Sequence, residues 1–245
     1  MFKISVLVLL FVQMLFAGSI NVAAAANVTY AIDELKAEFA KINPNVKIVV
    51  TLGSSGKLTA QIKNGAPYGL FMSANMKYPQ ALYADGIATT KPVVYAQGGL
   101  AFLSTRKQEF SMELLRSEKI KKIAVANPKT APYGLAAVEA MKNAKVYDDV
   151  RSKFVYAESI SQTVSYTMIA TDIGIIAISS LYSPKMGQYK EGVNWACVDP
   201  KLYTPIKQGV VLLKHAQDNR DYKAFYDFVL SDKAKEIFKK YGYIL

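Results

Sequence analysis

A chain of 245 residues, 51% of them hydrophobic, is long enough for one large domain or two small domains packed together. Its single cysteine, Cys197, excludes an internal disulfide and a metal site built from several cysteines. The net charge of +11 would suit a nucleic-acid binder. However, the basic residues are mostly scattered among acidic ones and accompany no nucleic-acid-binding motif. A diffuse positive field that attracts small anions is therefore the better interpretation.

The N-terminus has the pattern of a secretory signal peptide over residues 1–17. Lys3 is followed by an uncharged, mostly apolar run over residues 4–17, which is shorter than the roughly 20 residues that a membrane-spanning helix needs. We therefore expect the leader to be removed and the mature chain to work in the periplasm. A retained membrane anchor is the alternative, because Leu15 stands where a signal peptidase prefers a small residue.

Behind the leader, short runs rich in Val and Ile alternate with longer amphipathic stretches. This alternation is typical of βαβ units around largely parallel sheets. Strands are predicted over residues 20–25, 46–52, 70–73, 93–103, 123–126, 153–156, 173–178, 195–198 and 209–213. Helical spacing of apolar side chains, as in Ile32, Leu35 and Phe39, predicts helices between them and two adjacent helices at the C-terminus. The mature chain is expected to be a compact α/β protein.

Three loops between a predicted strand and a predicted helix lack charge and are rich in small or hydroxyl side chains. They cover residues 24–29, 53–56 and 159–163, and they contain Asn27, Ser55 and Ser161. Ligands of open α/β sheets bind at the carboxyl ends of strands, where helix N-termini present unpaired N–H donors. All three loops are therefore candidate anion cradles. The alternative is that these residues only cap their own helices, since Asn and Ser are preferred N-caps.

Other classes of protein find less support in the sequence. His215 is the only histidine, so a Ser-His-Asp triad or a histidine-ligated metal site would need distant partners that cannot be nominated. Cys197 lies in an apolar strand context, which predicts a buried and unreactive thiol. The 16 tyrosines could suit a carbohydrate-binding module, but they are spread through the predicted helices beside a single Trp, so core and rim packing explains most of them. Neither an enzyme nor a sugar-binding module is the preferred interpretation.

Four segments resemble the periplasmic molybdate-binding proteins of molybdate ABC importers. They are residues 24–27, the loop and helix start at 53–58, the stretch QIKNGAPYGLFMSA at 61–74 and the closing AKEIFKKYGY at 234–243. The resemblance runs in order through the whole mature chain, and the stretch at 61–74 is the most specific part of it. It implies a substrate-binding protein that delivers molybdate to a membrane permease with its cytoplasmic ATPase. The alternative is a protein of the same fold for another oxyanion, such as sulfate or phosphate.

The resemblance also implies the architecture. We expect the type II periplasmic binding protein fold, with two mixed sheets flanked by helices and joined by two crossover strands. Lobe 1 would contain residues 18–97 plus 210–245, and lobe 2 would contain residues 98–209. The family further implies a monomer with no cofactor, in which metal is bound only as the oxyanion.

Site residues follow from the resemblance by motif position. Asn27 would donate its side-chain amide and backbone N–H, Ser55 its hydroxyl and N–H, and Tyr133 and Ile160 a backbone N–H each. Further candidates are Ala26, Ser54 and Ser161. Ala26 stands where some relatives have a hydroxyl ligand, so at most its N–H could serve.

This chain departs from the family pattern in several places. Many relatives have Ser in place of Asn27 and Tyr in place of Ala177, so the site is an asparagine-bearing variant. Gly69 and Asn75 replace Asp residues, which leaves open how the loop after residue 73 is supported. The sequence does not separate molybdate from tungstate, whose dianions are nearly equal in size.

Overall fold

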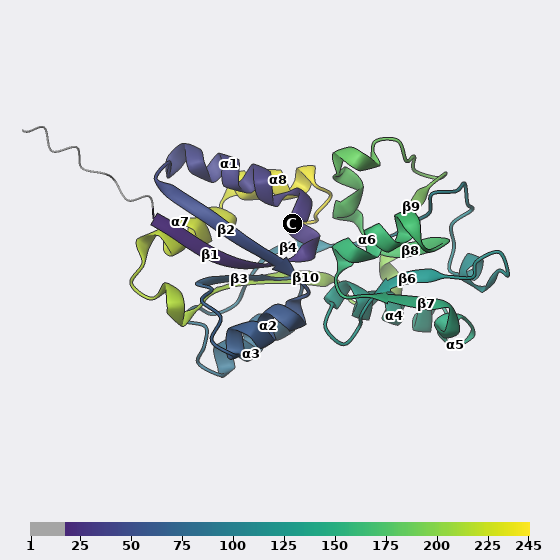
Figure 1. Cartoon of the computed structure of the whole chain (residues 1–245), viewed down its shortest axis with the longest axis horizontal. Coiled ribbons are helices and arrows are strands. Elements are labelled where there is room, and N and C mark those ends of the chain that lie inside the picture. Colours follow the sequence, from purple (N-terminus) through teal and green to yellow (C-terminus); the bar gives the residue numbers. More distant parts are fainter. Residues whose placement is uncertain (1–17) are drawn as a thin grey trace, which may run out of the picture.

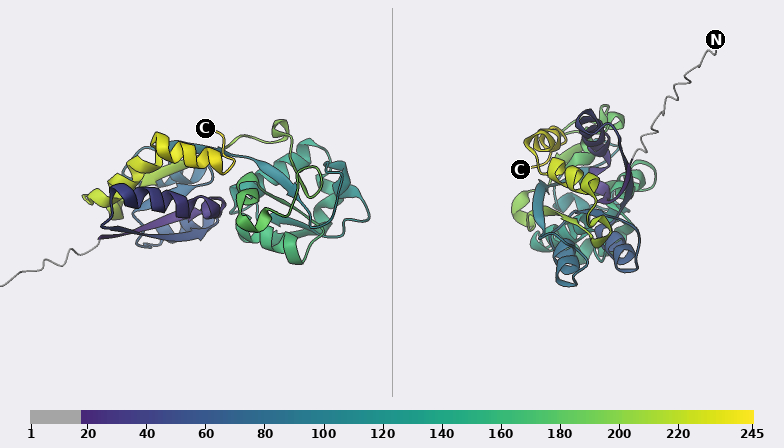
Figure 2. Two further views of the ribbon diagram at one scale, coloured as in Figure 1. Left: turned by 90° about the horizontal axis from the view of Figure 1, so that it is seen from above. Right: turned by 90° about the vertical axis from the view of Figure 1, so that its left-hand side faces the viewer.

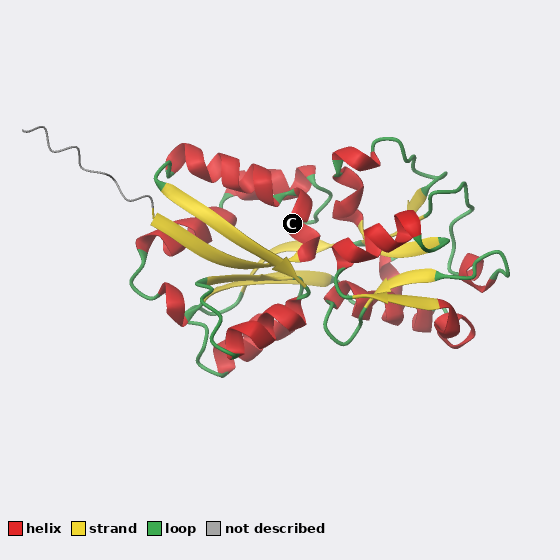
Figure 3. Ribbon diagram, viewed as in Figure 1, coloured by secondary structure: helices red, strands yellow, loops and turns green. Residues whose placement is uncertain are grey.

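The computed structural model describes residues 18–245, and the predicted signal peptide over residues 1–17 lies outside the described residues. The described chain forms two bodies side by side, each built on a five-stranded mixed sheet with helices on both faces (Figures 1 and 3). We call the body that contains β1 lobe 1 and the other lobe 2. The predicted fold class is confirmed by this arrangement.

Lobe 1 is built on a sheet with the strand order β2-β1-β3-β10-β4. β1, β2 and β3 run parallel, and β10 runs antiparallel to both of its neighbours. The strands are β1 (Gly18–Ala25), β2 (Val46–Gly53), β3 (Leu70–Ser73), β4 (Val93–Gly98) and β10 (Ile206–Leu212), and the helices are α1 (Ile32–Ile42), α2 (Ser55–Lys63), α3 (Lys77–Ala84), α7 (Arg220–Val229) and α8 (Asp232–Lys240). The apolar stripe of α1 places Phe39 against Phe225 of α7, with ring centroids 5.1 Å apart, so α1, α7 and α8 share one core.

Lobe 2 is built on a sheet with the strand order β7-β6-β8-β5-β9. Its central strands β6 and β8 are buried along their whole length, as their uninterrupted apolar sequences require. The strands are β5 (Leu100–Leu103), β6 (Ile123–Ala126), β7 (Phe154–Ala157), β8 (Ile173–Ala177) and β9 (Trp195–Cys197), and the helices are α4 (Pro132–Asn143), α5 (Tyr147–Val150) and α6 (Ile160–Ile169).

Two chain segments connect the lobes, as the view from above in Figure 2 shows. The strand predicted over residues 93–103 is divided into β4 and β5 at Gly98 and Gly99. A Cβ at Gly98 would lie 1.9 Å from the Tyr133 hydroxyl oxygen, so only glycine lets the chain pass so close to this ring. The return segment is β10, which begins at Ile206 rather than at residue 209 as predicted.

Neither Asn27, Ser55 nor Ser161 occupies an N-cap position. Asn27 lies inside a 3-10 turn (Ala26–Tyr30) that separates β1 from α1. Ser54 is the N-cap of α2, and Ser159 is the N-cap of α6, where its side chain accepts from the N–H of Gln162 at 3.3 Å. Capping of their own helices therefore does not explain the three predicted residues.

The expectation of a buried Cys197 is wrong, because the residue is exposed. β9 is a three-residue strand at the edge of the second sheet, so its outer side meets solvent. Among residues 18–245, no helix has the length and apolar character needed to cross a bilayer.

Candidate functional site

The carboxyl ends of strands from both lobes face each other around a small cavity. This is the position at which open α/β sheets bind ligands. Lobe 1 lines it with Ala25, Ala26, Asn27, Gly53, Ser54, Ser55 and Ala74. Lobe 2 lines it with Ala131, Pro132, Tyr133 and Ile160. No residue in this lining carries a formal charge at neutral pH, and every polar group it offers is a hydroxyl, an amide or a backbone group.

Three helices begin at the cavity: α2 at Ser55, α4 at Pro132 and α6 at Ile160. The first N–H groups of a helix have no acceptor within the helix, and the helix dipole adds positive potential at this end. Ser55, Tyr133 and Ile160 lie in these first turns, so their N–H groups are donors of the kind that suits an anion.

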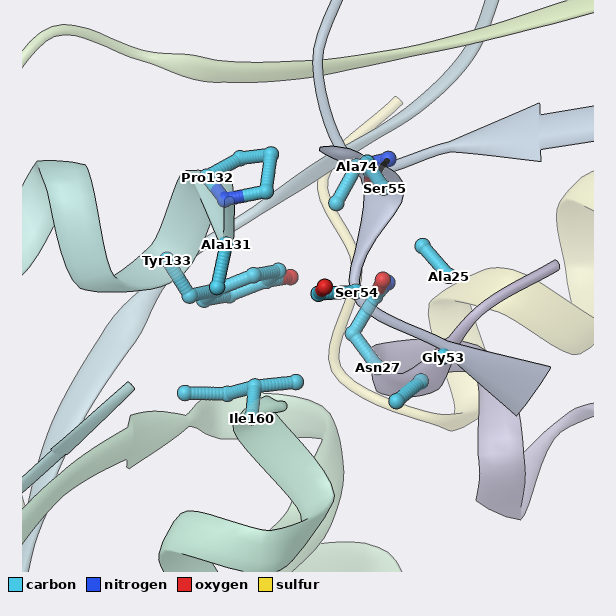
Figure 4. A pocket seen from close by; sticks show the side chains of 11 residues that line it. Ala25, Asn27, Gly53, Ser54, Ser55, Ala74, Ala131, Pro132, Tyr133 and Ile160 are labelled. Atoms are coloured by element: carbon cyan, nitrogen blue, oxygen red, sulfur yellow. Dashed lines mark hydrogen bonds between the residues drawn. The ribbon is translucent and has the colours of Figure 1, made fainter. Parts of the chain in front are cut away.

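The structure brings six of the seven candidate residues to this cavity. Asn27, Ser55, Tyr133 and Ile160 line it together, and so do Ala26 and Ser54. Figure 4 shows the Tyr133 ring, the Ser54 hydroxyl and the Asn27 amide directed toward the cavity, which Ile160 also borders. Ser161 is outside the lining, and its hydroxyl lies 3.2 Å from that of Ser159.

The two serines of the second loop have different surroundings. The Ser55 hydroxyl oxygen accepts from the backbone N–H of Ala74 at 2.9 Å, so its own hydrogen is available to a ligand. The Ser54 hydroxyl is buried and has no hydrogen-bond partner among residues 18–245. Because a buried unpaired hydroxyl is costly, Ser54 is a group that a ligand could satisfy.

Gly69 and Asn75, which stand where the family pattern has Asp, are accommodated without disturbing the loop after residue 73. The Asn75 Oδ1 accepts from the Ser73 hydroxyl and from the Tyr78 N–H, both at 3.3 Å, which orders the chain next to Ala74. Gly69 packs under the Tyr222 ring, where an added Cβ would lie 2.3 Å from a ring carbon. An Asp at this position would therefore displace Tyr222.

Asn27 is 1% exposed and is held from several sides. Its Nδ2 donates to Gln208 Oε1 at 2.8 Å and to the Tyr243 hydroxyl at 2.9 Å. Its backbone carbonyl accepts from the Tyr243 hydroxyl at 2.8 Å and from the Ser179 hydroxyl at 3.0 Å. The expected free amide donor is thus engaged with protein partners, and Oδ1 is the atom left without a hydrogen bond.

Sequence reasoning missed Gln208 and Tyr243, which contact Asn27, and Tyr95, whose hydroxyl donates to Gln208. Gln208 is completely buried although it is polar, and it stands just before the strand predicted at residue 209. The position of Gln208 just before a predicted strand does not indicate that its side chain is buried, because residues distant in the sequence bury it. The one available signal was a polar side chain next to a long apolar run.

The tyrosines around the site stay neutral at physiological pH. Burial raises the pKa of Tyr133 and Tyr95 well above the usual value, and it also raises the pKa of Tyr243. The electrostatics of the cavity therefore come from neutral hydroxyls, amides and helix termini.

Several contacts join the lobes beside the cavity. The Gly56 N–H of lobe 1 donates to the Thr130 carbonyl of lobe 2 at 2.8 Å. Lys57 Nζ lies 2.7 Å from Glu158 Oε1, and both of these side chains are about half exposed. These contacts hold the lobes together over the site, so the described arrangement is a closed one.

The chain is similar to known solute-binding proteins along almost its whole length. The family of bacterial extracellular solute-binding proteins matches residues 20–244. The molybdate-binding protein ModA of Rhodobacter capsulatus is 36% identical over 93% of this chain and 89% of its own length, and ModA of Azotobacter vinelandii is 33% identical over 93% and 90%.

Solved structures agree with this relationship. The periplasmic molybdate-binding protein of Azotobacter vinelandii superposes with a TM-score of 0.85 at 30% identity, over 92% of this chain and 99% of that one. The sulfate-binding protein SubI of Mycobacterium tuberculosis reaches a TM-score of 0.77 at 13% identity, over 92% and 86%, which shows a shared fold alone. This chain therefore belongs to the bacterial extracellular solute-binding proteins and, among them, to the family of molybdate-binding proteins.

Proposed function

We propose that this protein captures molybdate, and also tungstate, as the binding component of an ABC importer. The observation that carries this proposal is the small cavity between the lobes, lined by uncharged groups and approached by three helix N-termini. Such a lining favours a compact anion, because many N–H and O–H donors converge where no lysine or arginine intervenes.

The chemistry of the lining also favours a fully deprotonated tetrahedral dianion. Hydrogen bonds to a charged oxygen are short, about 2.7–2.9 Å, and stronger than those between neutral groups. Hydrogenphosphate brings a proton that needs an acceptor, and a site made of donors leaves that proton facing another donor. Sulfate has no such proton but is smaller, so some donors would be stretched.

We assign the ligand contacts to the residues predicted from the sequence. Ser55 supplies its hydroxyl and N–H, Tyr133 and Ile160 supply N–H groups, and Asn27 supplies its amide. Ser54 is a further donor, supported by its buried hydroxyl without a partner. Metal is held only as the oxyanion, and no cofactor takes part.

Binding is proposed to draw the two lobes together, and a membrane permease with a cytoplasmic ATPase would read the closed shape. The lobe boundaries at residues 97/98 and 209/210 remain part of this proposal. The packing supports the second boundary, since Ile206 belongs to the cluster that contains most of the lobe 2 core, whereas Val210 packs in the core of lobe 1. We propose that the protein works in the periplasm as a monomer and is not an enzyme.

A thermal-shift experiment on residues 18–245 tests the proposal. A ligand that binds only the folded chain raises its melting temperature as the ligand concentration exceeds the dissociation constant. Molybdate and tungstate are expected to raise it in parallel, while sulfate and phosphate at the same concentration leave it unchanged. A larger shift with sulfate or phosphate would assign the site to another oxyanion.

A further inference from the structure

Gln208 connects the ligand cavity to the segments that join the lobes. It lies in β10, and its side chain is completely buried. Its Oε1 accepts from Asn27 Nδ2 at 2.8 Å and from the Tyr95 hydroxyl at 2.7 Å. Its Nε2 donates to the Tyr133 hydroxyl at 3.0 Å. One amide thus touches lobe 1, lobe 2 and the other crossover strand, β4.

In these hydrogen bonds Asn27 uses its Nδ2 donor, so its Oδ1 acceptor is the atom left for the ligand, and an acceptor does not suit a dianion. Asn27 Nδ2 is turned to Gln208 and Tyr243, and the buried Oδ1 has no partner. A carbonyl oxygen that faces the cavity accepts hydrogen bonds and repels an anion that has no proton to give. A molybdate ligand requires the nitrogen at that place.

A joint half-turn of the two amides corrects the mismatch and keeps both amides hydrogen-bonded to each other. Gln208 Nε2 would then donate to Asn27 Oδ1 and to the Tyr95 hydroxyl, while its Oε1 would accept from the Tyr133 hydroxyl. The Tyr243 hydroxyl would donate to Asn27 Oδ1, and the Asn27 carbonyl would keep the Ser179 hydroxyl, now 3.0 Å away. The bond from the Tyr243 hydroxyl to the Asn27 carbonyl is given up, and the new bond from Asn27 Nδ2 to the charged ligand offsets it.

A half-turn of Asn27 alone is unfavourable. Its Oδ1 would then face Gln208 Oε1 over the 2.8 Å now spanned by a hydrogen bond, and two acceptors at that distance repel each other. The two amides must therefore reorient together, and the direction of the Asn27 amide depends on Gln208.

We propose that Gln208 is a positioning residue that directs the Asn27 amide nitrogen into the cavity and so selects a fully deprotonated oxyanion. This inference rests on the proposed function, because it names how one ligand contact of that site is set. In the opposite orientation, Asn27 Oδ1 would accept a hydrogen bond from an O–H group of the ligand, and the site would suit a hydrogen oxyanion instead.

A double-mutant cycle separates positioning from packing. Gln208→Met keeps the approximate volume but removes both amide atoms. We expect it to weaken molybdate binding on the order of tenfold when Asn27 is present, as for a lost hydrogen bond to a charged group. In the Asn27→Ser background the same substitution should have little effect, because a serine hydroxyl rotates freely and needs no partner to present its hydrogen.

The control is Gln61→Met, the same substitution on α2, where the Gln61 side chain accepts only from the Tyr68 hydroxyl at 3.3 Å. Its molybdate affinity should match that of the wild type. An equal loss from Gln208→Met in both backgrounds would mean that Gln208 acts through packing, and no loss in either background would also overturn the proposal.

A second measurement covers the case in which Asn27→Ser abolishes binding. The side-chain NH₂ signals of Gln208 and Asn27 in ¹⁵N-labelled protein can be assigned from the variants that lack them. Molybdate should shift both pairs, since both nitrogens change partners, and an unchanged Gln208 pair would overturn the joint rotation. Failure of the wild-type protein to bind molybdate would instead contradict the proposed function, and this is visible before any variant is made.

Discussion

Ser55 combines two donors in one residue, a hydroxyl held by the Ala74 N–H and a backbone N–H at the start of α2. Ser55→Ala removes the hydroxyl and leaves the N–H in place. Because the lost bond is to a charged ligand, we expect molybdate binding to weaken by about 1–3 kcal/mol in a calorimetric titration. Ser161→Ala is the control, because Ser161 lies outside the cavity lining and its substitution should leave the affinity unchanged. Equal affinities for Ser55→Ala and the wild type would show that the Ser55 hydroxyl does not contact the ligand.

Asn27→Asp tests the sign of the potential that the ligand meets. The side chain is buried beside the cavity, so a carboxylate there would repel a dianion and would lack the amide hydrogens that Gln208 and Tyr243 accept. Molybdate binding should be lost more completely than with Ser55→Ala, as judged by equilibrium dialysis. Binding like that of the wild type would move Asn27 away from the ligand.

At the residue scale, sequence reasoning located the cavity but not the support behind it. The positions of Asn27, Ser54 and Ser55 follow from loops at strand ends, where small and hydroxyl side chains are a local signal. The contacts of Gln208, Tyr95 and Tyr243 join residues that are at least 75 positions apart. No local pattern reports such pairs, so their place in the site became visible only in the folded chain.

At the element scale, the start of α2 meets the loop before α4 across the lobe boundary. Gly56 contributes the N–H of this contact, and an added Cβ would lie 2.9 Å from the Thr130 Cα of the other lobe. Its other close neighbour is the Tyr78 hydroxyl of the same lobe, which is the far end of a long side chain and donates to the Lys129 carbonyl at 3.4 Å.

Gly56→Ala should therefore disfavour closure rather than folding. Overpacking of this kind costs about 1–3 kcal/mol, whereas Ala in place of Gly favours a helix. We expect weaker molybdate affinity by calorimetry and an unchanged or higher melting temperature of the free protein. Gly187→Ala is the matched control, since its Cβ would meet only the Pro184 carbonyl oxygen at 3.7 Å. A lower melting temperature with normal affinity would contradict this account.

The elements themselves could be predicted because their signals are local. β3 and β6 begin and end at the predicted residues, and α1, α7 and α8 follow the helical spacing of their apolar residues. The division of residues 93–103 into two strands was not predictable, because it depends on the Tyr133 ring that packs against Gly98. The 3-10 turn after β1 was missed because short 3-10 turns have no periodic signature.

At the scale of the whole molecule, buried tyrosines link stability to alkaline pH. Burial raises the pKa of Tyr95, Tyr133 and Tyr243 above that of unfolded tyrosine, which is about 10. Below this pH both states are protonated, and above it the unfolded chain loses protons that the folded chain retains. The free energy of unfolding should therefore be constant toward neutral pH and fall as the pH rises above about 10.

Urea unfolding at a series of pH values measures this effect. Tyr95→Phe removes one of the three buried hydroxyls and should make the alkaline fall shallower. A fall that begins near neutral pH, or one that Tyr95→Phe leaves unchanged, would show that other groups govern the alkaline stability.

The two lobes carry the function together, since Asn27 and Ser55 lie on one lobe and Tyr133 and Ile160 on the other. The central claim is that the cavity between them binds molybdate or tungstate in preference to other oxyanions. Isothermal titration calorimetry of residues 18–245 with molybdate, tungstate, sulfate and phosphate tests it most directly. The account predicts tight one-to-one binding of molybdate and tungstate, with little or no heat from sulfate and phosphate. Preferential binding of sulfate or phosphate, or no binding of any of the four, would contradict it.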